Sequence, residues 1–449
     1  MVPNDARSLL ERAERDDPRG HALHVAAAMA WCFLEAIANT PEAIAWGALL
    51  AVWVLRLPRI WRCLVPALRD PIWLAFLAWW LWSLLTLLWS PPEVDLARQL
   101  RPERAILTPL LLFPVASRPW ALLGALAAGS AVQLVAVLVH AMLPLASGGS
   151  IRTYGEMEGL TAFRSMGWYL QIAAVVPLAA FAAMKDRRRW SLLPLPILAT
   201  IAIVLSGLRS VLGNLLAGAA MLALRPRRAG RARQAMVGAA LLAGAMLAAS
   251  ILAASSLAPT SLERFARDPI RAVSLLLGPD GPLGTAAAVT SPEDSSREAV
   301  LSLGSDRVGL WWASIDLIRG DLRTALVGSG RGSFPPRLAQ WLDAEREAHP
   351  RSEEFATRAA SNRHPHNLQL RAWIEGGLPQ LALATTAIWA LAARLWRRSA
   401  NDAALAAMLA VYAAVLLSSL VGIVEAKAPG AIIALAIALA GAAREPDRA

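Results

Sequence analysis

Long runs of apolar residues, separated by short charged connections, constrain this chain more than any other feature. Of its 449 residues, 56% are hydrophobic and 17% are charged, whereas a soluble protein of this length carries about a quarter charged residues. Such runs cross a bilayer as helices, because a helix satisfies its own backbone hydrogen bonds where no water is present. The sequence therefore predicts an all-α polytopic membrane protein.

Twelve runs are predicted as transmembrane helices. Basic residues cluster in four of the five internal connections on the side that also holds both chain ends, and the fifth holds Arg118. The positive-inside rule makes this side cytoplasmic, so the net charge of +11 sets orientation and does not indicate nucleic acid as a partner. The predicted spans are 22–39, 42–57, 71–90, 104–117, 119–145, 167–184, 190–206, 210–224, 235–255, 377–396, 403–424 and 429–443.

This topology divides the chain into five segments. They are a cytoplasmic tail (1–21) without the features of a cleavable signal peptide, nine spans (22–255), a large periplasmic loop (256–376), three further spans (377–443) and a short cytoplasmic tail (444–449). The first part of the loop, 258–297, is rich in Pro, Gly and Ser and is predicted to be irregular. The two cysteines, Cys32 and Cys63, are poorly placed to pair, so no disulfide is expected.

Later in the periplasmic loop the pattern becomes helical. An amphipathic helix is predicted over 306–319, where apolar residues recur at helical spacing: Val308, Trp311, Trp312, Ile315 and Ile318. A second helix is predicted over 334–348. Asn367 can cap a third helix, which is predicted to end at Gly376 and Gly377. A loop of this length with helices of its own is usually functional.

His366, beside Asn367, is the predicted catalytic residue. An imidazole exchanges a proton near neutral pH, and the positive end of a helix dipole starting at Asn367 favours the neutral form that a general base needs. The alternative is that His366 only makes a local hydrogen bond near the helix start. His364 is the competing histidine, and it has a structural role as its own alternative.

Three arginines are predicted on the same side of the membrane. Arg164 precedes the sixth span, Arg209 lies in the short turn between the seventh and eighth spans, and Arg307 begins the first loop helix. Guanidinium groups bind phosphate through paired hydrogen bonds, so these residues are candidate ligands for a lipid-linked diphosphate. Each can instead be an interfacial arginine whose charged group reaches water.

Two other kinds of site are not predicted. The glycine-rich run 328–332 lacks the preceding strand and the Lys-Ser/Thr pair of a nucleotide-binding loop, so it is predicted as a turn between loop helices. His349, His364 and His366 have no cysteine or carboxylate partners at metal-ligand spacing. A site that uses no metal or other cofactor is therefore expected.

These residues resemble the motifs of the O-antigen ligase and polymerase superfamily, which are glycosyltransferases of the bacterial envelope. The matching segments, in chain order, are Arg164-x2-Gly167, the Ser-Gly-Leu-Arg turn 206–209, the Arg307-x3-Trp311 helix, the Gly-x-Gly-x-Gly-x-Phe run 328–334 and His366-Asn367-x9-Gly377. The first five spans match only in kind. The ligase pattern Gly-x-x-Gly is interrupted at Gln380, and Gly207 and Leu208 separate the family's Ser-Arg pair, so the subfamily and the acceptor stay open.

The resemblance implies a GT-C-like glycosyltransferase of the bacterial inner membrane, active at the periplasmic face. It would transfer a glycan, with inversion and without metal, from undecaprenyl diphosphate to a hydroxyl of lipid A-core. In the alternative, an O-antigen or exopolysaccharide polymerase, the acceptor is another lipid-linked glycan. His366 would deprotonate or orient the acceptor hydroxyl, and the diphosphate would be held by Arg164, Arg209 and Arg307. Supporting roles would fall to Asn367, His364 and Gly377.

A 12-helix transporter is the alternative from another class, and a receptor or scaffold that docks through the loop is a third. Transporters place charged or broken-helix sites at the middle of the membrane, often in duplicated halves. The predicted span interiors hold little charge, with Glu35 an exception, and the sequence has no internal repeat. Substituting His366 by Ala should abolish glycan transfer but leave a transporter or a scaffold active.

Overall fold

The described part of the chain is helical throughout. A computed structural model describes residues 6–37, 39–95, 104–143, 166–184, 186–205, 209–224, 306–348, 365–400, 402–421 and 427–443. Within these ranges all regular secondary structure is helix, and strands are absent. The all-α prediction is confirmed for these residues.

The helices follow the apolar runs and the loop pattern of the sequence. In chain order the α-helices are α1 (Ala6–Asp16), α2 (Pro18–Glu35), α3 (Asn39–Leu68), α4 (Pro71–Leu85), α6 (Arg104–Leu112), α7 (Pro119–Met142), α9 (Met166–Ala183), α10 (Pro194–Leu205), α11 (Arg209–Leu224), α15 (Asp306–Arg319), α16 (Leu322–Leu326), α17 (Phe334–Ala348), α19 (Leu368–Ser399), α20 (Ala403–Val421) and α21 (Lys427–Ala442). Short 3-10 helices are η1 (Thr86–Trp89), η3 (Phe113–Val115) and η6 (Arg187–Leu192).

Several of these helices could cross a membrane. Five described helices are long and apolar enough by length and composition: 39–68, 71–89, 119–140, 368–399 and 403–420. Shorter apolar helices cover 106–115, 167–183, 213–223 and 428–442. This pattern is that of a multi-pass membrane protein. The total of twelve spans stays a prediction, and the predicted span 235–255 lies outside the described residues.

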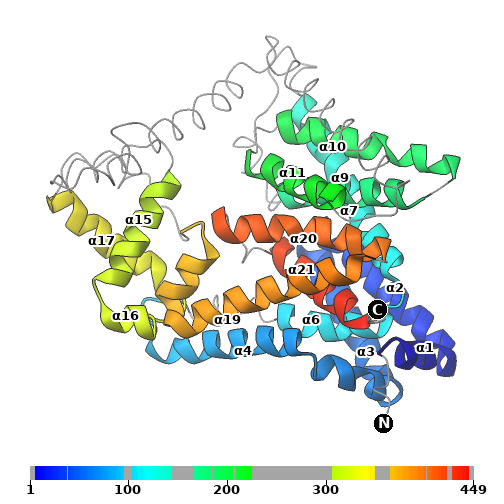
Figure 1. Cartoon of the computed structure of the whole chain (residues 1–449), viewed down its shortest axis with the longest axis horizontal. Helices are drawn as coiled ribbons and strands as arrows, with labels where there is room; N and C mark the ends of the chain where they lie inside the picture. Colours follow the sequence, from blue (N-terminus) through cyan, green and yellow to red (C-terminus); the bar gives the residue numbers. More distant parts are fainter. Residues whose placement is uncertain are drawn as a thin grey trace.

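α20 forms the centre of the bundle. Every residue from Ala404 to Val415 is buried, and the helix packs against α9, α11, α19 and α21. A helix that is apolar all round is stable only when neighbours or lipid cover every face. Figure 1 shows α4, α19 and α20 running alongside one another, with α15, α16 and α17 at one end and α1 at the opposite end.

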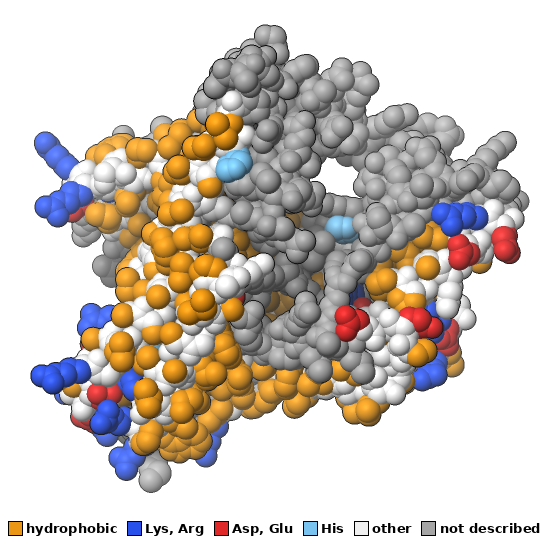
Figure 2. Space-filling model, turned by 180° about the vertical axis from the view of Figure 1, so that it is seen from behind, with side chains coloured by type: hydrophobic (Ala, Val, Ile, Leu, Met, Phe, Trp, Pro, Cys, Tyr) orange, Lys and Arg blue, Asp and Glu red, His pale blue; other side chains and the backbone are white. Residues whose placement is uncertain are grey.

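Charged residues mark the two ends of the bundle. At the end near α1, Arg394 of α19 pairs with Asp70, the N-cap of α4. Arg398 also donates there to the carbonyls of Ala440 and Ala443 near the end of α21. On the face seen in Figure 2, hydrophobic side chains cover much of the surface of the described residues, and charged side chains lie mostly toward the left and right edges. This distribution suits a protein whose apolar surface lies in lipid.

The basic stretch 56–69, predicted as a connection between spans, is helical. The structure continues α3 through it to Leu68, with Pro58 and Pro66 inside the helix. Arg56 is accommodated because its Nε donates to Asp17 Oδ2 at 2.9 Å and its Nη1 donates to His24 Nδ1 at 2.9 Å. Paired in this way, the charge does not require the helix to end. Cys63, expected in the connection, is buried in α3, and both cysteines are free.

The loop helices share a small core of their own with the start of α19. It consists of Leu310, Ala313 and Ile318 of α15, Phe334, Leu338 and Leu342 of α17, and Ile374 of α19. The predicted bounds of α15 and α17 are confirmed. The buried face of α15 is rotated from the predicted apolar stripe, because the helix packs through Leu310 and Ala313 while Ile315 is 38% exposed.

Candidate functional site

Asn367 fixes the start of α19 and ties it to α20. As the N-cap, it accepts a hydrogen bond from the backbone N–H of Leu370 at 2.9 Å. Its amide Nδ2 donates to the carbonyl of Leu420 at 2.8 Å. The predicted cap is confirmed. The second bond, to the end of α20, is a contact that the sequence pattern did not predict.

His366 stands directly before this cap in an unusual backbone conformation. Its φ is 53°, and it is the one non-glycine residue with a positive φ among the residues that the structure describes. Such a conformation costs about 1–3 kcal/mol and persists only where the surroundings enforce it. Here buried Pro365 precedes it and the capped helix follows. Strained residues of this kind concentrate at functional sites, so the backbone marks His366 out independently of its side chain.

Gly377 breaks α19 where the sequence predicted a helix end. Its φ is 67° and its ψ is −165°. A Cβ at this position would lie 2.4 Å from the carbonyl oxygen of Leu326, so glycine is required for the close approach. The prediction of a break is confirmed. Two helical segments meet at this kink, as predicted, and the second runs on to Ser399.

The carbonyls freed by the kink are satisfied by other elements. Pro379 has no N–H for the carbonyl of Glu375, and Gly330 N–H donates to this carbonyl instead, at 2.9 Å. Ser329 donates to the carbonyl of Ile374 through its backbone N–H at 2.8 Å and its hydroxyl at 2.9 Å. Trp82 Nε1 of α4 donates to the carbonyl of Gly376 at 2.8 Å. The break is therefore built into the fold and does not expose unpaired backbone.

The glycine-rich run 328–332 is the turn between α16 and α17, as predicted. Gly328, Gly330 and Gly332 all have positive φ. A Cβ on Gly328 would lie 2.5 Å from the backbone of Glu375, and one on Gly330 would lie 2.5 Å from Ser90 Cα. Ser90 also donates through its hydroxyl to the carbonyl of Arg331 at 2.9 Å. These glycines let the turn pack closely against α19 and the end of η1.

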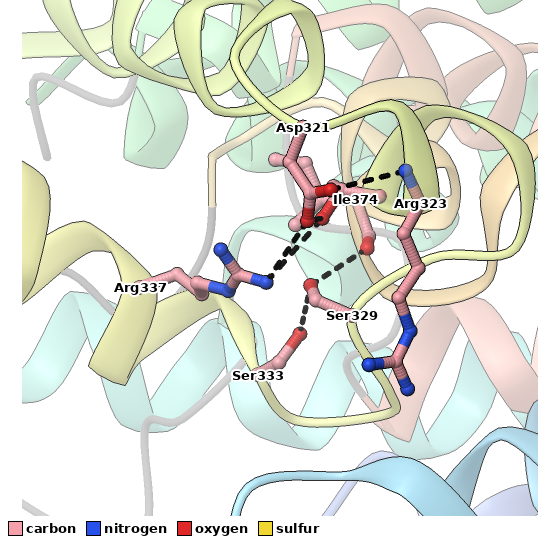
Figure 3. A network of polar contacts seen from close by, with 7 residues as sticks. Asp321, Arg323, Ser329, Ser333, Arg337 and Ile374 are labelled. Carbon is pink, nitrogen blue, oxygen red and sulfur yellow. Dashed lines mark hydrogen bonds and ion pairs between the residues drawn. The ribbon is translucent and has the colours of Figure 1, made fainter.

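A polar network holds α16 and α17 in place (Figure 3). Asp321, the N-cap of α16, accepts from Thr324 Oγ1 at 2.6 Å and from Arg323 N–H at 3.0 Å, and Arg337 of α17 reaches it at 3.4 Å. The hydrogen bond from Thr324, followed by that from Arg323 and the charge of Arg337, lowers the pKa of Asp321. Nearby, the hydroxyls of Ser329 and Ser333 lie 2.8 Å apart.

A buried ion pair lies between His366 and the kink. Arg371 Nε donates to Glu375 Oε1 at 3.1 Å, and their side chains are 11% and 3% exposed. The sequence analysis missed this pair. Its signal was available, since opposite charges four residues apart lie on one helix face, and both stand in an otherwise apolar stretch.

The structure describes the backbone of two of the three predicted arginines. Arg209 is the first residue of α11 and Arg307 is the second residue of α15, but their side chains lie outside the described part of the structure. Arg164 and His364 also lie outside the described residues. No distance between His366 and these groups is therefore described.

The elements that carry His366 and Arg209 both contact the end of α20, and the element that carries Arg307 packs on α19. Asn214, five residues after Arg209 in α11, donates to Ser418 Oγ at 3.3 Å. Gln369 of α19 donates to the adjacent Ser419 Oγ at 3.4 Å. The starts of α11 and α19 therefore both lie at the end of α20, while α15 shares the small core with α19. Among the described residues, His, Cys, Asp and Glu form no group of three suited to a metal ion.

A second polar cluster lies at the opposite end of the bundle and was not predicted. His24 accepts from Arg56 through Nδ1 and donates through Nε2 to the carbonyl of Leu111 at 2.9 Å. Burial by itself would raise the pKa of Asp17, but hydrogen bonds from Arg56 and Gly20 outweigh it and lower that pKa. The cluster joins α2, α3 and α6 through contacts within the protein.

Comparison with known proteins found no match that indicates a function. No protein-family model matches the sequence, and none of the curated proteins matches it.

Proposed function

We propose that the protein is a glycosyltransferase of the O-antigen ligase type. It transfers a glycan from undecaprenyl diphosphate to a hydroxyl of lipid A-core, at the membrane face on which the loop helices lie. The order of the motifs along the sequence supports this assignment. So does the arrangement of the elements that carry the predicted ligands, because the starts of α11 and α19 both lie at the end of α20 and α15 packs on α19.

In the proposed reaction, His366 accepts the proton of the acceptor hydroxyl. The hydroxyl oxygen then bonds to the anomeric carbon from the face opposite the diphosphate, and the bond from that carbon to the diphosphate oxygen breaks. Its electron pair leaves with undecaprenyl diphosphate, which inverts the anomeric configuration. Arg164, Arg209 and Arg307 stabilise the leaving diphosphate by charge and paired hydrogen bonds.

The observation that carries the proposal is the backbone of His366. The residue is held at a positive φ immediately before a capped helix, at the end of α20 where α11 also begins. The N-terminal end of a helix disfavours a positive charge nearby, which keeps an imidazole neutral and able to accept a proton.

The structure also bears on the transporter alternative. Carriers use the freed backbone groups of a broken helix to bind an ion or substrate. In α19 the carbonyls of Ile374, Glu375 and Gly376 are already bonded to Ser329, Gly330 and Trp82. The described helix break is thus filled by protein groups, which favours the enzyme.

Complementation of envelope mutants tests the proposal. The chain is expected to restore long glycan chains on lipid A-core in a ligase-deficient strain, read as the lipopolysaccharide ladder. Restoration only in a polymerase-deficient strain would identify the alternative, a polymerase. Restoration in neither strain, with the protein present in the membrane, would contradict the assignment.

A histidine comparison tests the proposed base. His366→Ala should reduce transfer by about 10²–10⁴-fold, the usual contribution of a general base. His140→Ala is the matched control, because His140 Nδ1 donates to the carbonyl of Ala136 in its own helix at 3.0 Å and it has no proposed role in transfer. Equal activity of the two variants, at equal protein levels, would exclude His366 as the base.

An arginine comparison tests the diphosphate ligands. Arg209→Lys and Arg307→Lys keep the charge but lose the paired hydrogen bonds of guanidinium, so both should weaken transfer. Arg346→Lys is the control, because Arg346 forms an exposed pair with Asp343 on α17. Unchanged transfer in all three variants would remove the arginines from the mechanism.

A further inference from the structure

The short helix α16 has its polar and apolar residues on the wrong sides for a helix in water. Thr324 is 1% exposed, whereas Leu322 is 73% and Leu326 is 48% exposed. Val327, directly after the helix, is 40% exposed. Water favours the opposite arrangement, because apolar surface gains free energy when it leaves water. We call Leu322, Leu326 and Val327 the α16 apolar face.

The orientation of α16 is fixed by contacts at both of its ends. At the start, Asp321 caps the helix and binds Thr324 and Arg337, which holds the Thr324 side toward α17 (Figure 3). Near the end, Trp373 Nε1 of α19 donates to the carbonyl of Ala325 at 2.9 Å. The leucines therefore cannot turn inward without breaking this network, so their exposure is a built feature of the fold.

The α16 apolar face continues into the apolar surface of membrane-spanning helices. The carbonyl of Leu326 lies against Gly377, and the next residue, Leu378, is 45% exposed. The turn after α16 packs on Ser90 at the end of η1. Exposed leucines follow from there along η1 and α4: Leu88 (80%), Leu85 (44%) and Leu81 (50%). Figure 1 shows α16 beside this end of α4.

We propose that α16 lies in the bilayer, with the acyl chains of the nearer leaflet covering Leu322, Leu326 and Val327. Residues 71–89 form a candidate span, so the exposed leucines of α4 and η1 are expected to contact lipid. The same lipid layer extends without interruption over the kink of α19 to α16. The exposed residues Arg319 and Arg323 flank this face, and long basic side chains reach from apolar surroundings to the headgroups.

Lipid fits this face better than a second copy of the chain does. A stable protein interface buries roughly 800 Å² on each partner, which is far more than two leucines and a valine supply. The apolar surface also extends along the membrane-spanning helices, as expected where the covering layer is the bilayer itself. The proposal does not depend on glycan transfer.

Spin-label accessibility in nanodiscs tests the proposal with the full chain. Single cysteines replace Leu322 or Leu326 in a background with Cys32→Ala and Cys63→Ala, and each carries a nitroxide. Leu85→Cys on α4 is the lipid-facing reference, and Gln340→Cys, exposed on α17, is the aqueous reference. Two relaxation rates of the nitroxide are measured, one caused by oxygen, which concentrates in lipid, and one caused by a water-soluble nickel chelate. Their quotient is the oxygen-to-nickel ratio.

The expected result is an oxygen-to-nickel ratio at positions 322 and 326 that matches the ratio at Leu85 and exceeds that at Gln340. A ratio matching that at Gln340 would show that water covers the face, and the proposal would be wrong. Low accessibility to both reagents would show that protein covers it and would equally overturn the proposal. Because two separate positions are labelled, a folding defect in one variant leaves the other as a test.

Discussion

At the scale of single residues, Gly377 combines a positive φ with a close approach to the backbone of another element. We predict that Gly377→Ala destabilises the protein by about 2–6 kcal/mol, from about 1–3 kcal/mol for the positive φ with an extended ψ and about 1–3 kcal/mol for the clash with the carbonyl of Leu326. The measurement is the apparent melting temperature in detergent. Because the kink also positions the start of α19, transfer activity should fall with it.

Gly47 supplies the matched control for this prediction. It lies inside α3, and a Cβ there would meet no atom within 4 Å. Gly47→Ala should leave the melting temperature unchanged or raise it, because alanine favours a helix by roughly 0.5–1 kcal/mol over glycine. Equal losses in the two variants would mean that the close approach at Gly377 does not matter to stability.

Single residues were also where sequence patterns were most informative about the candidate site. Asn367 as a cap and Gly377 as a break follow from local chemistry, since both depend on backbone groups within a few residues. The donors to the freed carbonyls, Ser329, Gly330 and Trp82, come from distant parts of the chain. Local spacing carries no information about such partners.

At the scale of elements, the first part of α19 depends on the buried pair of Arg371 and Glu375. We predict that Glu375→Gln destabilises the protein by about 3 kcal/mol, because removing one partner leaves a buried charge. Asp343→Asn is the comparison. It breaks a pair of the same 3.1 Å length with Arg346, but the side chains there are 72% and 39% exposed, so about 0–1 kcal/mol is expected.

The two shifts in melting temperature, measured side by side, check this prediction. A loss at Glu375 no larger than that at Asp343 would show that the burial of the α19 pair has no energetic effect.

The attachment of α16 should depend on pH through Asp321. Its pKa is lower in the folded protein than the ordinary value of 3.8, so it stabilises the fold at pH above that value. This contribution is lost as the pH falls through the lowered pKa. We predict that backbone N–H groups of α16 lose protection from hydrogen exchange below about pH 4, relative to α17.

Asp321→Asn is the control for this pH effect. Asparagine caps a helix about as well as aspartate but does not titrate, so the variant should show no added loss of protection in acid. An identical acid response in both proteins would assign the effect to another group.

Among the elements, sequence periodicity gave the bounds of α15 and α17 but did not predict that α3 continues as a helix to Leu68. The loop helices end at residues whose local signals are strong, such as Phe334-Pro335-Pro336. The basic residues of α3 have the pattern of a connection between spans. Arg56 is nevertheless buried, because it bonds to His24 of α2 and to Asp17, the N-cap of α2. The groups that bind Arg56 belong to another element, so local spacing does not reveal them.

At the scale of the whole molecule, the loop helices and α1 should lie on opposite sides of the membrane. We predict that Gln340→Cys on α17 reacts with a membrane-impermeant maleimide in spheroplasts, whereas Arg12→Cys on α1 reacts only after lysis. Both residues are exposed, and the native cysteines are buried. Labelling of both positions before lysis would contradict the predicted orientation.

The sequence by itself determined that this chain is helical and apolar enough to pass through a membrane several times. It also determined the helices of the loop, the cap at Asn367 and the break at Gly377. These features depend on composition and on neighbours within a few residues, which the sequence displays directly. Tertiary structure decided which elements meet. Packing brings the starts of α11 and α19 to the end of α20. It also places Ser329, Gly330 and Trp82 against the carbonyls of the kink. It leaves the leucines of α16 exposed. Each of these contacts joins residues far apart in the chain, and only the folded shape sets their distance.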